Sequence, residues 1–173
     1  MTKITTKLSD NLRVAFKTAD EIWVAVALLN IQGFDYIERT ISKKCKINFI
    51  GGIDLPTDPA ALTKLLNLKT KQTVSAYIFT DGIFHPKVFI TRVGDQFTSF
   101  VGSANCTNGG LNRNIEMTIE INDLSISKQL LAWFSKTQEN SIILTADFIS
   151  DYLPKYKNRI KRRKEDQVEI KSI

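Results

Sequence analysis

A short and nearly continuous apolar run at residues 21–29 places the strongest constraint on the fold of this chain. Such a run is typical of a strand that is buried on both faces of a sheet. Residues 46–50 and 73–79 are interpreted as a second and a third strand. Segments of helical character lie between them, and strands that alternate with helices form βαβ units. The pattern predicts an α/β fold with a mixed, mostly parallel sheet flanked by helices.

The two intervening helices have separate signals. Phe34, Ile37 and Ile41 recur at spacings of three and four, which predicts a helix over about 33–43. Asp58 followed by Pro59 is typical of a helix start, because aspartate caps the free N–H groups and proline fits the first turn. We expect that second helix to end near residue 69.

The second half of the chain has a different pattern. Gly94-Asp95 separates two extended segments and predicts a hairpin. We expect strands at 84–92, 97–101 and 115–121, and helices at 125–136 and 147–156. A chain of 173 residues suits one domain. We divide it into an α/β domain over 1–154 and a basic C-terminal helix end or tail over 155–173.

The net charge of +6 is concentrated near the C-terminus. Seven of the ten residues in 155–164 are basic, whereas residues 1–154 hold 16 basic and 15 acidic residues. One interpretation is a solvated helix end or linker. The other is a contact with the phosphate backbone of nucleic acid, which would make binding salt-dependent. For that second interpretation the candidate residues are Lys161, Arg162, Arg163 and Lys164.

The numbers of cysteines and histidines and the length of the apolar runs limit the classes of protein to which this chain can belong. Two cysteines and one histidine cannot form a four-ligand zinc site within one chain, and they suggest no disulfide framework. No apolar run is long enough for a membrane helix, and residues 1–7 lack the apolar centre of a signal peptide. We therefore expect a cytoplasmic protein.

The densest group of chemically active residues lies around the predicted hairpin. His85 and Lys87 are two residues apart, as are Ser103 and Asn105, and residues at this spacing share one face of a strand. A three-residue loop at 94–96 would place Lys87 opposite Ser103 and His85 opposite Asn105. We predict that loop, or a bulge of the same parity. An imidazole, an ammonium, a hydroxyl and an amide would then converge, a set that binds and attacks a phosphate.

These residues resemble the signature of the phospholipase D superfamily, H-x-K followed by G-S-x-N. The matching segments are His85-Pro86-Lys87 and Gly102-Ser103-Ala104-Asn105, and the run from Asn108 to Glu116 is also similar. The likeness is greatest to the nuclease branch, including metal-independent restriction endonucleases with one signature per chain. In one departure, Arg92 occupies a position that is often Asp in the family. It weighs somewhat against the lipid-cleaving branch.

The resemblance implies a mechanism. One histidine attacks phosphorus to form a phosphohistidine, a second protonates the leaving oxygen, and Lys87, Ser103 and Asn105 hold the phosphoryl oxygens. It also implies that Glu116 orients the histidine and that neither a metal nor a cofactor takes part. Because this chain has one histidine, both roles can be filled only in a homodimer with His85 from each chain.

Several nearby residues have simpler interpretations. Arg113 could bind phosphate, but it could also be an ordinary loop residue. Gly109-Gly110 is interpreted as a loop, and Glu120 as an exposed strand carboxylate. Four large aromatic residues are assigned to the core rather than to base stacking, namely Trp23, Phe84, Phe89 and Trp133.

Three functions remain open. The first is a DNA-cleaving phosphodiesterase of restriction or defence type, with a separate recognition domain or subunit as a possible partner. The second is a phospholipid headgroup hydrolase or transferase, which would need an exposed apolar loop or amphipathic helix at the site, and the sequence indicates neither. The third is a non-catalytic nucleic-acid-binding or dimerisation module.

Overall fold

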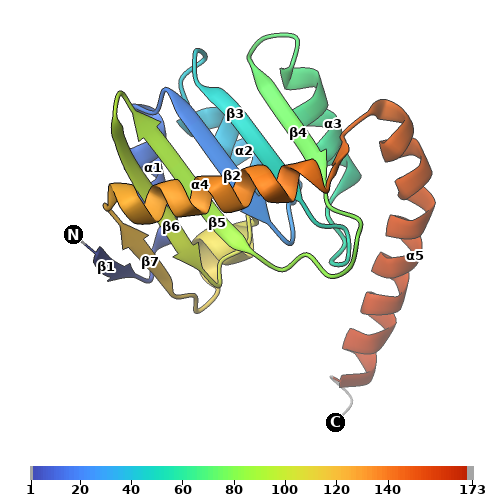
Figure 1. Cartoon of the computed structure of the whole chain (residues 1–173). Helices are drawn as coiled ribbons and strands as arrows, with labels where there is room; N and C mark the ends of the chain where they lie inside the picture. Colours follow the sequence, from blue (N-terminus) through green and yellow to red (C-terminus); the bar gives the residue numbers. More distant parts are fainter. Residues whose placement is uncertain (1, 171–173) are drawn as a thin grey trace.

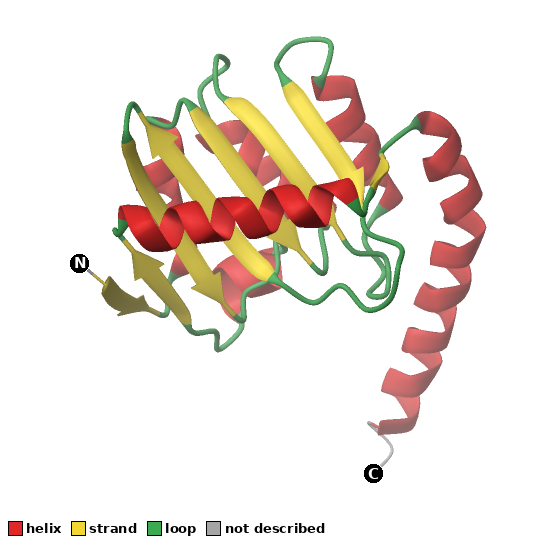
Figure 2. Cartoon of the chain, viewed as in Figure 1, coloured by secondary structure: helices red, strands yellow, loops and turns green. Residues whose placement is uncertain are grey.

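The computed structural model describes residues 2–170, and the side chains of 164 and 166–170 are not described. One eight-stranded sheet forms the centre of the molecule, with helices on both faces (Figures 1 and 2). The strands are β1 (Thr2–Thr5), β2 (Glu21–Val26), β3 (Lys46–Gly51), β4 (Val74–Ile78), β5 (Lys87–Val93), β6 (Gln96–Gly102), β7 (Thr118–Ile121) and β8 (Ile142–Ile143). The helices are α1 (Leu8–Lys17), α2 (Ile31–Thr40), α3 (Pro59–Leu68), α4 (Leu124–Glu139) and α5 (Ala146–Ile170), with a short π-helical turn η1 (Gly109–Arg113).

The sheet has the order β1-β7-β6-β5-β2-β3-β4-β8. This confirms a mixed α/β fold, but the expectation of mostly parallel pairing is wrong. Only β2 with β3 and β3 with β4 pair in parallel, and the other five described pairings are antiparallel. The chain returns from β4 to β5 through residues 79–86, which is too short for the crossover of a dozen or more residues that a parallel strand requires.

The starts of α2 and α3 are fixed by side-chain caps. The Asp58 side chain accepts a hydrogen bond from the Ala60 N–H at 2.9 Å, with Pro59 in the first turn, as predicted. The Asn30 side chain likewise accepts from the Gly33 N–H at 2.9 Å, so α2 begins two residues earlier than expected.

Two apolar clusters hold the layers together. The larger one joins the sheet to α1, α2, α3 and α5, and the smaller one joins the opposite face to α4 through Phe134. Figure 1 shows α4 crossing that face alone. Phe84 and Phe89 are buried in these clusters, as predicted, whereas Trp133 keeps about a third of its surface exposed.

Two N-terminal elements were missed in the sequence. In α1, Leu8, Leu12 and Phe16 recur every four residues, and all three are buried. β1 is an exposed edge strand that pairs with β7. Its short polar run gives no strand signal of its own, because the strand is defined by its partner.

The last helix is much longer than expected. α5 continues without a break across the expected boundary at 154–155 and includes Pro154. The basic segment 155–164 is therefore a helix end, and Figure 1 shows this part of α5 extending past one edge of the sheet.

Candidate active site

The signature segments meet at the edge of the sheet where β2 and β3 end and β5 begins. The backbone N–H groups of the two residues after β2 donate hydrogen bonds to these segments, one to each. Ala27 N–H donates to the Pro86 carbonyl at 3.0 Å, and Leu28 N–H donates to the Asn105 side-chain oxygen at 3.1 Å. The central strand therefore sets the separation of the H-x-K and G-S-x-N segments.

His85 and Lys87 are in direct contact. The Lys87 Nζ lies 2.8 Å from Nδ1 and 2.9 Å from Nε2 of His85, and 3.0 Å from the His85 carbonyl oxygen. His85 is exposed and precedes β5, so the prediction that both residues lie on one strand is wrong. Lys87 is the first residue of β5, is buried, and reaches back to the ring. Burial lowers the pKa of Lys87, and the Glu116 charge partly opposes that shift.

The predicted hairpin register is also wrong. Val93 pairs with Gln96 and Val88 with Val101, so the loop has two residues, Gly94 and Asp95, rather than three. Gly94 has a φ of +55°, which fits a type II′ turn with glycine at its first central position. With this register Lys87 lies opposite Gly102. Ser103 follows the end of β6 and forms hydrogen bonds with Met117, the residue before β7.

Ser103 and Glu116 form the second pair of the site. The Ser103 hydroxyl donates to one Glu116 oxygen, and Asn114 Nδ2 donates to the other at 3.0 Å. Ser103 Oγ also accepts from the Met117 N–H at 3.1 Å. Glu116 precedes β7, and among the described residues its hydrogen bonds go to serine and asparagine rather than to His85.

Asn105 is held with one end turned toward the interior. Its side-chain oxygen accepts from Leu28, which leaves the amide N–H bonds to donate to a ligand. Gly110 packs against it so closely that an added Cβ would lie 2.4 Å from the Asn105 carbonyl oxygen. The pair Gly109-Gly110 is therefore a packing element of the site, in η1, and not the simple loop that we expected.

A cavity of about 400 Å³ adjoins this cluster. Asn105 and Glu116 line it together with Arg163 from α5. The other lining residues are Leu28, Asn30, Leu55, Thr107, Gly109, Gly110 and Asn114. Of these, Gly109, Gly110 and Asn114 belong to the run that resembles the family, and the others had no sequence signal.

The remaining predicted binding residues do not share this cavity. Lys161 and Arg162 are exposed on α5, and the side chain of Lys164 lies outside the described residues. Arg113 ends η1 and is exposed. Among the predicted binding residues whose side chains are described, Arg163 alone lines the cavity.

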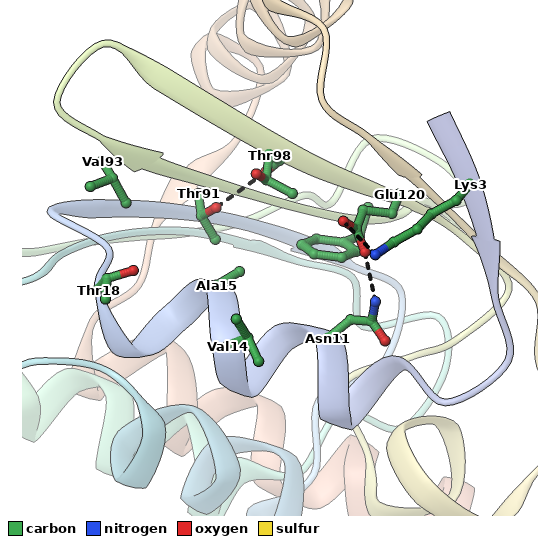
Figure 3. Close-up of a pocket in the computed structure, with 10 residues that line it drawn as sticks. Lys3, Asn11, Val14, Ala15, Thr18, Thr91, Val93, Thr98 and Glu120 are labelled. Carbon is green, nitrogen blue, oxygen red and sulfur yellow. Dashed lines mark hydrogen bonds and ion pairs between the residues drawn. The ribbon is translucent and has the colours of Figure 1, made fainter. Parts of the chain in front are cut away.

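Two charged residues have structural roles. Arg92 Nη2 lies 2.9 Å from a Glu21 oxygen, which pairs β5 with β2. The expectation that Glu120 is exposed is wrong, because only 8% of it is accessible. Figure 3 shows Glu120 between Lys3, whose Nζ lies at 3.2 Å, and Asn11, whose Nδ2 donates at 2.6 Å. Lys3 belongs to β1 and Asn11 to α1, and the sequence pattern had predicted neither element.

Three exposed apolar side chains surround the signature residues. Ile83 lies two residues before His85, and Ile115 and Met117 flank Glu116; their exposed fractions are 82%, 105% and 59%. The expectation that no exposed apolar loop lies at the site is therefore wrong.

Neither a metal cluster nor a membrane helix was found in the part of the chain that the structure describes. No group of three or more His, Cys, Asp or Glu side chains gathers there in a way that could hold a metal ion. No described helix combines the length and apolar character that a membrane crossing requires.

Comparison with solved structures finds the same fold in several proteins. NucT from Helicobacter pylori matches with a TM-score of 0.68 and 16% identity, over 83% of this chain and 98% of that one. Nuc from Salmonella typhimurium, a phospholipase D family member, matches with a TM-score of 0.65 and 15% identity, over 83% and 95%. TrmBL2, an archaeal chromatin protein, matches with a TM-score of 0.58 and 13% identity, over 82% of this chain and 53% of that one.

Comparison with curated proteins gave no match. The family model described as "Cardiolipin synthase, PLD-like domain" matches residues 13–138. That span includes both signature segments and Glu116, and it covers most of the chain. The chain therefore belongs to the PLD-like domain family and, with it, to the phospholipase D superfamily.

Proposed function

We propose that this chain is a metal-independent phosphodiesterase that cleaves DNA through a phosphohistidine on His85, at a site formed by two copies of the chain. A restriction or defence nuclease is the role we infer. The observation that carries the proposal is the contact between His85 and Lys87 beside Ser103, Glu116 and Asn105. His85 contacts Lys87, Ser103 contacts Glu116, and Asn105 and Glu116 line the adjoining cavity at this end of the sheet.

The proposed chemistry has two steps. A ring nitrogen of one His85 attacks phosphorus, so that a P–N bond forms and the P–O bond to the leaving group breaks. The second His85 supplies the proton that the leaving oxygen takes up. That imidazole then accepts a proton from water as the water oxygen attacks phosphorus, and cleavage of the P–N bond restores the first His85.

The other residues act on charge and orientation. The Lys87 ammonium and the Asn105 amide donate to the phosphoryl oxygens, where negative charge accumulates in the transition state. The Glu116 charge favours the protonated form of Lys87, and the Glu116 carboxylate fixes the Ser103 hydroxyl by its hydrogen bond. In the proposed dimer, Glu116 would orient the His85 of the partner copy.

Two observations support a shared site. The chain has one histidine, so one copy cannot supply both the nucleophile and the acid. His85 is exposed, and Ile83, Ile115 and Met117 expose apolar surface around it. A two-fold contact at this edge would bury those side chains and bring two imidazoles together.

Nucleic acid is the substrate that the charge favours. The basic end of α5 extends from the same edge of the sheet, and TrmBL2, which shares the fold, is described as having a novel mode of DNA binding.

The test is cleavage of plasmid and linear DNA in excess EDTA by the full chain, with RNA as a parallel substrate. We expect cleavage by the wild type, none by His85→Ala, and a dimer by light scattering. Asp81→Asn, in the exposed loop before the site, is the matched control and should stay active. An active protein that is strictly monomeric at the assay concentration would contradict the shared site, and an inactive dimer would favour the binding module.

A phospholipid substrate is the second candidate, because the matching family model names a cardiolipin synthase and the site exposes apolar side chains. Headgroup release from anionic phospholipid vesicles, lost on Ile115→Ser in a protein that remains dimeric, would support it. The same substitution should weaken the dimer if the apolar residues form the two-fold contact.

A further inference from the structure

The basic half of α5 has one face that is directed toward the domain. Tyr152, Tyr156, Arg159 and Arg163 follow one another at spacings of four, three and four, which places them along one side of a helix. This side changes from aromatic to basic as the helix passes the edge of the sheet.

Three of these side chains fix the helix to the domain. The Tyr152 hydroxyl is buried and donates to the Thr57 carbonyl at 3.0 Å. Tyr156 packs against the larger core cluster. Arg159 Nη1 donates to the carbonyl oxygens of Ile53 and Asp54, the second at 3.3 Å. The helix is thereby attached to the loop between β3 and α3.

That loop also contacts the segment that carries the signature histidine. The Asp54 side chain accepts from the Phe84 N–H at 3.0 Å, and Phe84 is the residue before His85. One residue therefore contacts both the basic helix and the segment that presents the nucleophile. The position of α5 relative to the site follows from direct contacts on the described chain.

Arg163 lies one turn beyond Arg159 and lines the cavity that contains Asn105 and Glu116. No ion pair or hydrogen bond of Arg163 occurs within the described residues. Lys161, Arg162 and Arg163 are all exposed, but Lys161 lies 4.0 Å from Glu165 and neither Lys161 nor Arg162 lines the cavity. The Glu116 carboxylate in the same wall already accepts from Ser103 and Asn114.

We propose that Arg163 is a substrate-binding residue that holds a second phosphate of the nucleic-acid backbone, next to the scissile one, in the cavity it shares with Asn105. A guanidinium binds phosphate through paired N–H donors, and a neighbouring phosphate of the same strand supplies the charge. The inference rests on the proposed function. It concerns a helix outside the family model, which ends at residue 138, and it divides the basic segment into one site residue and several solvated ones.

Two substrates separate this role from the chemistry. An oligonucleotide has several phosphates, whereas bis(p-nitrophenyl) phosphate has one. Arg163→Gln should lower kcat/KM for the oligonucleotide about tenfold and leave the small diester within twofold of the wild type. Arg162→Gln is the matched control, with the same charge change on the adjacent residue, and should change neither substrate more than about twofold.

Binding gives a readout that does not need turnover. In a His85→Ala background, Arg163→Gln should raise the Kd for the oligonucleotide about tenfold and reduce the salt slope by about one phosphate contact. Equal effects of Arg163→Gln and Arg162→Gln would overturn the inference, as would an equal loss on both substrates. If the wild type cleaves neither substrate, the proposed function fails, and the binding comparison still decides the role of Arg163.

Discussion

The hydroxyl of Thr57 joins the two strand ends that support the site, and its removal should destabilise the whole edge. Thr57 is fully buried. Its Oγ1 donates to the Gly52 carbonyl at 2.7 Å, at the end of β3, and accepts from the Leu29 N–H at 3.3 Å, beyond the end of β2. Thr57→Val keeps the shape of the side chain and removes both hydrogen bonds.

The expected loss of stability in Thr57→Val follows from the Gly52 carbonyl and the Leu29 N–H, which both lose their hydrogen-bond partner. A buried donor or acceptor that loses its partner costs about 1–3 kcal/mol, so two such groups should lower the free energy of unfolding by about 3 kcal/mol. For a chain of this size that corresponds to a decrease in Tm of roughly 6–12 °C. Thr57→Ser keeps the hydroxyl and loses one methyl group, which should cost only about 1 kcal/mol.

Urea denaturation followed by tryptophan fluorescence measures both variants against the wild type. Thr57→Val should be clearly less stable than Thr57→Ser. If the two variants unfold at the same midpoint, or if Thr57→Val lies within about 0.5 kcal/mol of the wild type, the hydrogen bonds of Thr57 do not hold this edge together.

Three further predictions concern the site and the core. Asn105→Asp keeps the acceptor for the backbone N–H but replaces the amide donor with a negative charge, so the Tm should hold while kcat/KM on DNA falls more than about 100-fold; unchanged activity would refute the assignment. Because burial lowers the pKa of Lys87, the activity of the wild type should decrease at a pH below the ordinary lysine pKa of about 10.4. Glu116→Gln removes a charge that raises the pKa of Lys87, so this decrease in activity should occur at a lower pH in the variant. A pH profile of kcat/KM whose alkaline decrease is the same in Glu116→Gln and the wild type would contradict the effect of Glu116 on Lys87. Burial raises the pKa of Cys45 and Cys106 to about 12, so iodoacetamide should leave both thiols unmodified in the native protein and label both in urea, as read by intact mass.

Local sequence signals predicted the elements that carry their own information. The Asp58-Pro59 start of α3 needed only a cap and a restricted backbone, and both are present. The apolar run at residues 21–29 reflected the burial of the central strand β2. The signature residues were selected by their spacing, and the structure places His85 and Lys87 in contact.

Features that depend on distant partners could not be predicted in this way. The register of the hairpin was decided by the turn at Gly94, where one residue of difference changes which side chains are level with each other. Glu120 appeared exposed because its partners Lys3 and Asn11 lie more than 100 residues earlier. Arg163 appeared equivalent to its basic neighbours until the docking of α5 gave the helix an inward face.

The central claim is that His85 becomes covalently attached to phosphorus. The direct measurement is mass spectrometry of the full chain, quenched at alkaline pH during turnover of DNA in excess EDTA, because phosphohistidine is lost in acid. The account predicts a phosphoryl–DNA adduct that maps to His85 and is absent from His85→Ala. Turnover by the wild type with no adduct on His85, together with cleavage by His85→Ala, would contradict it.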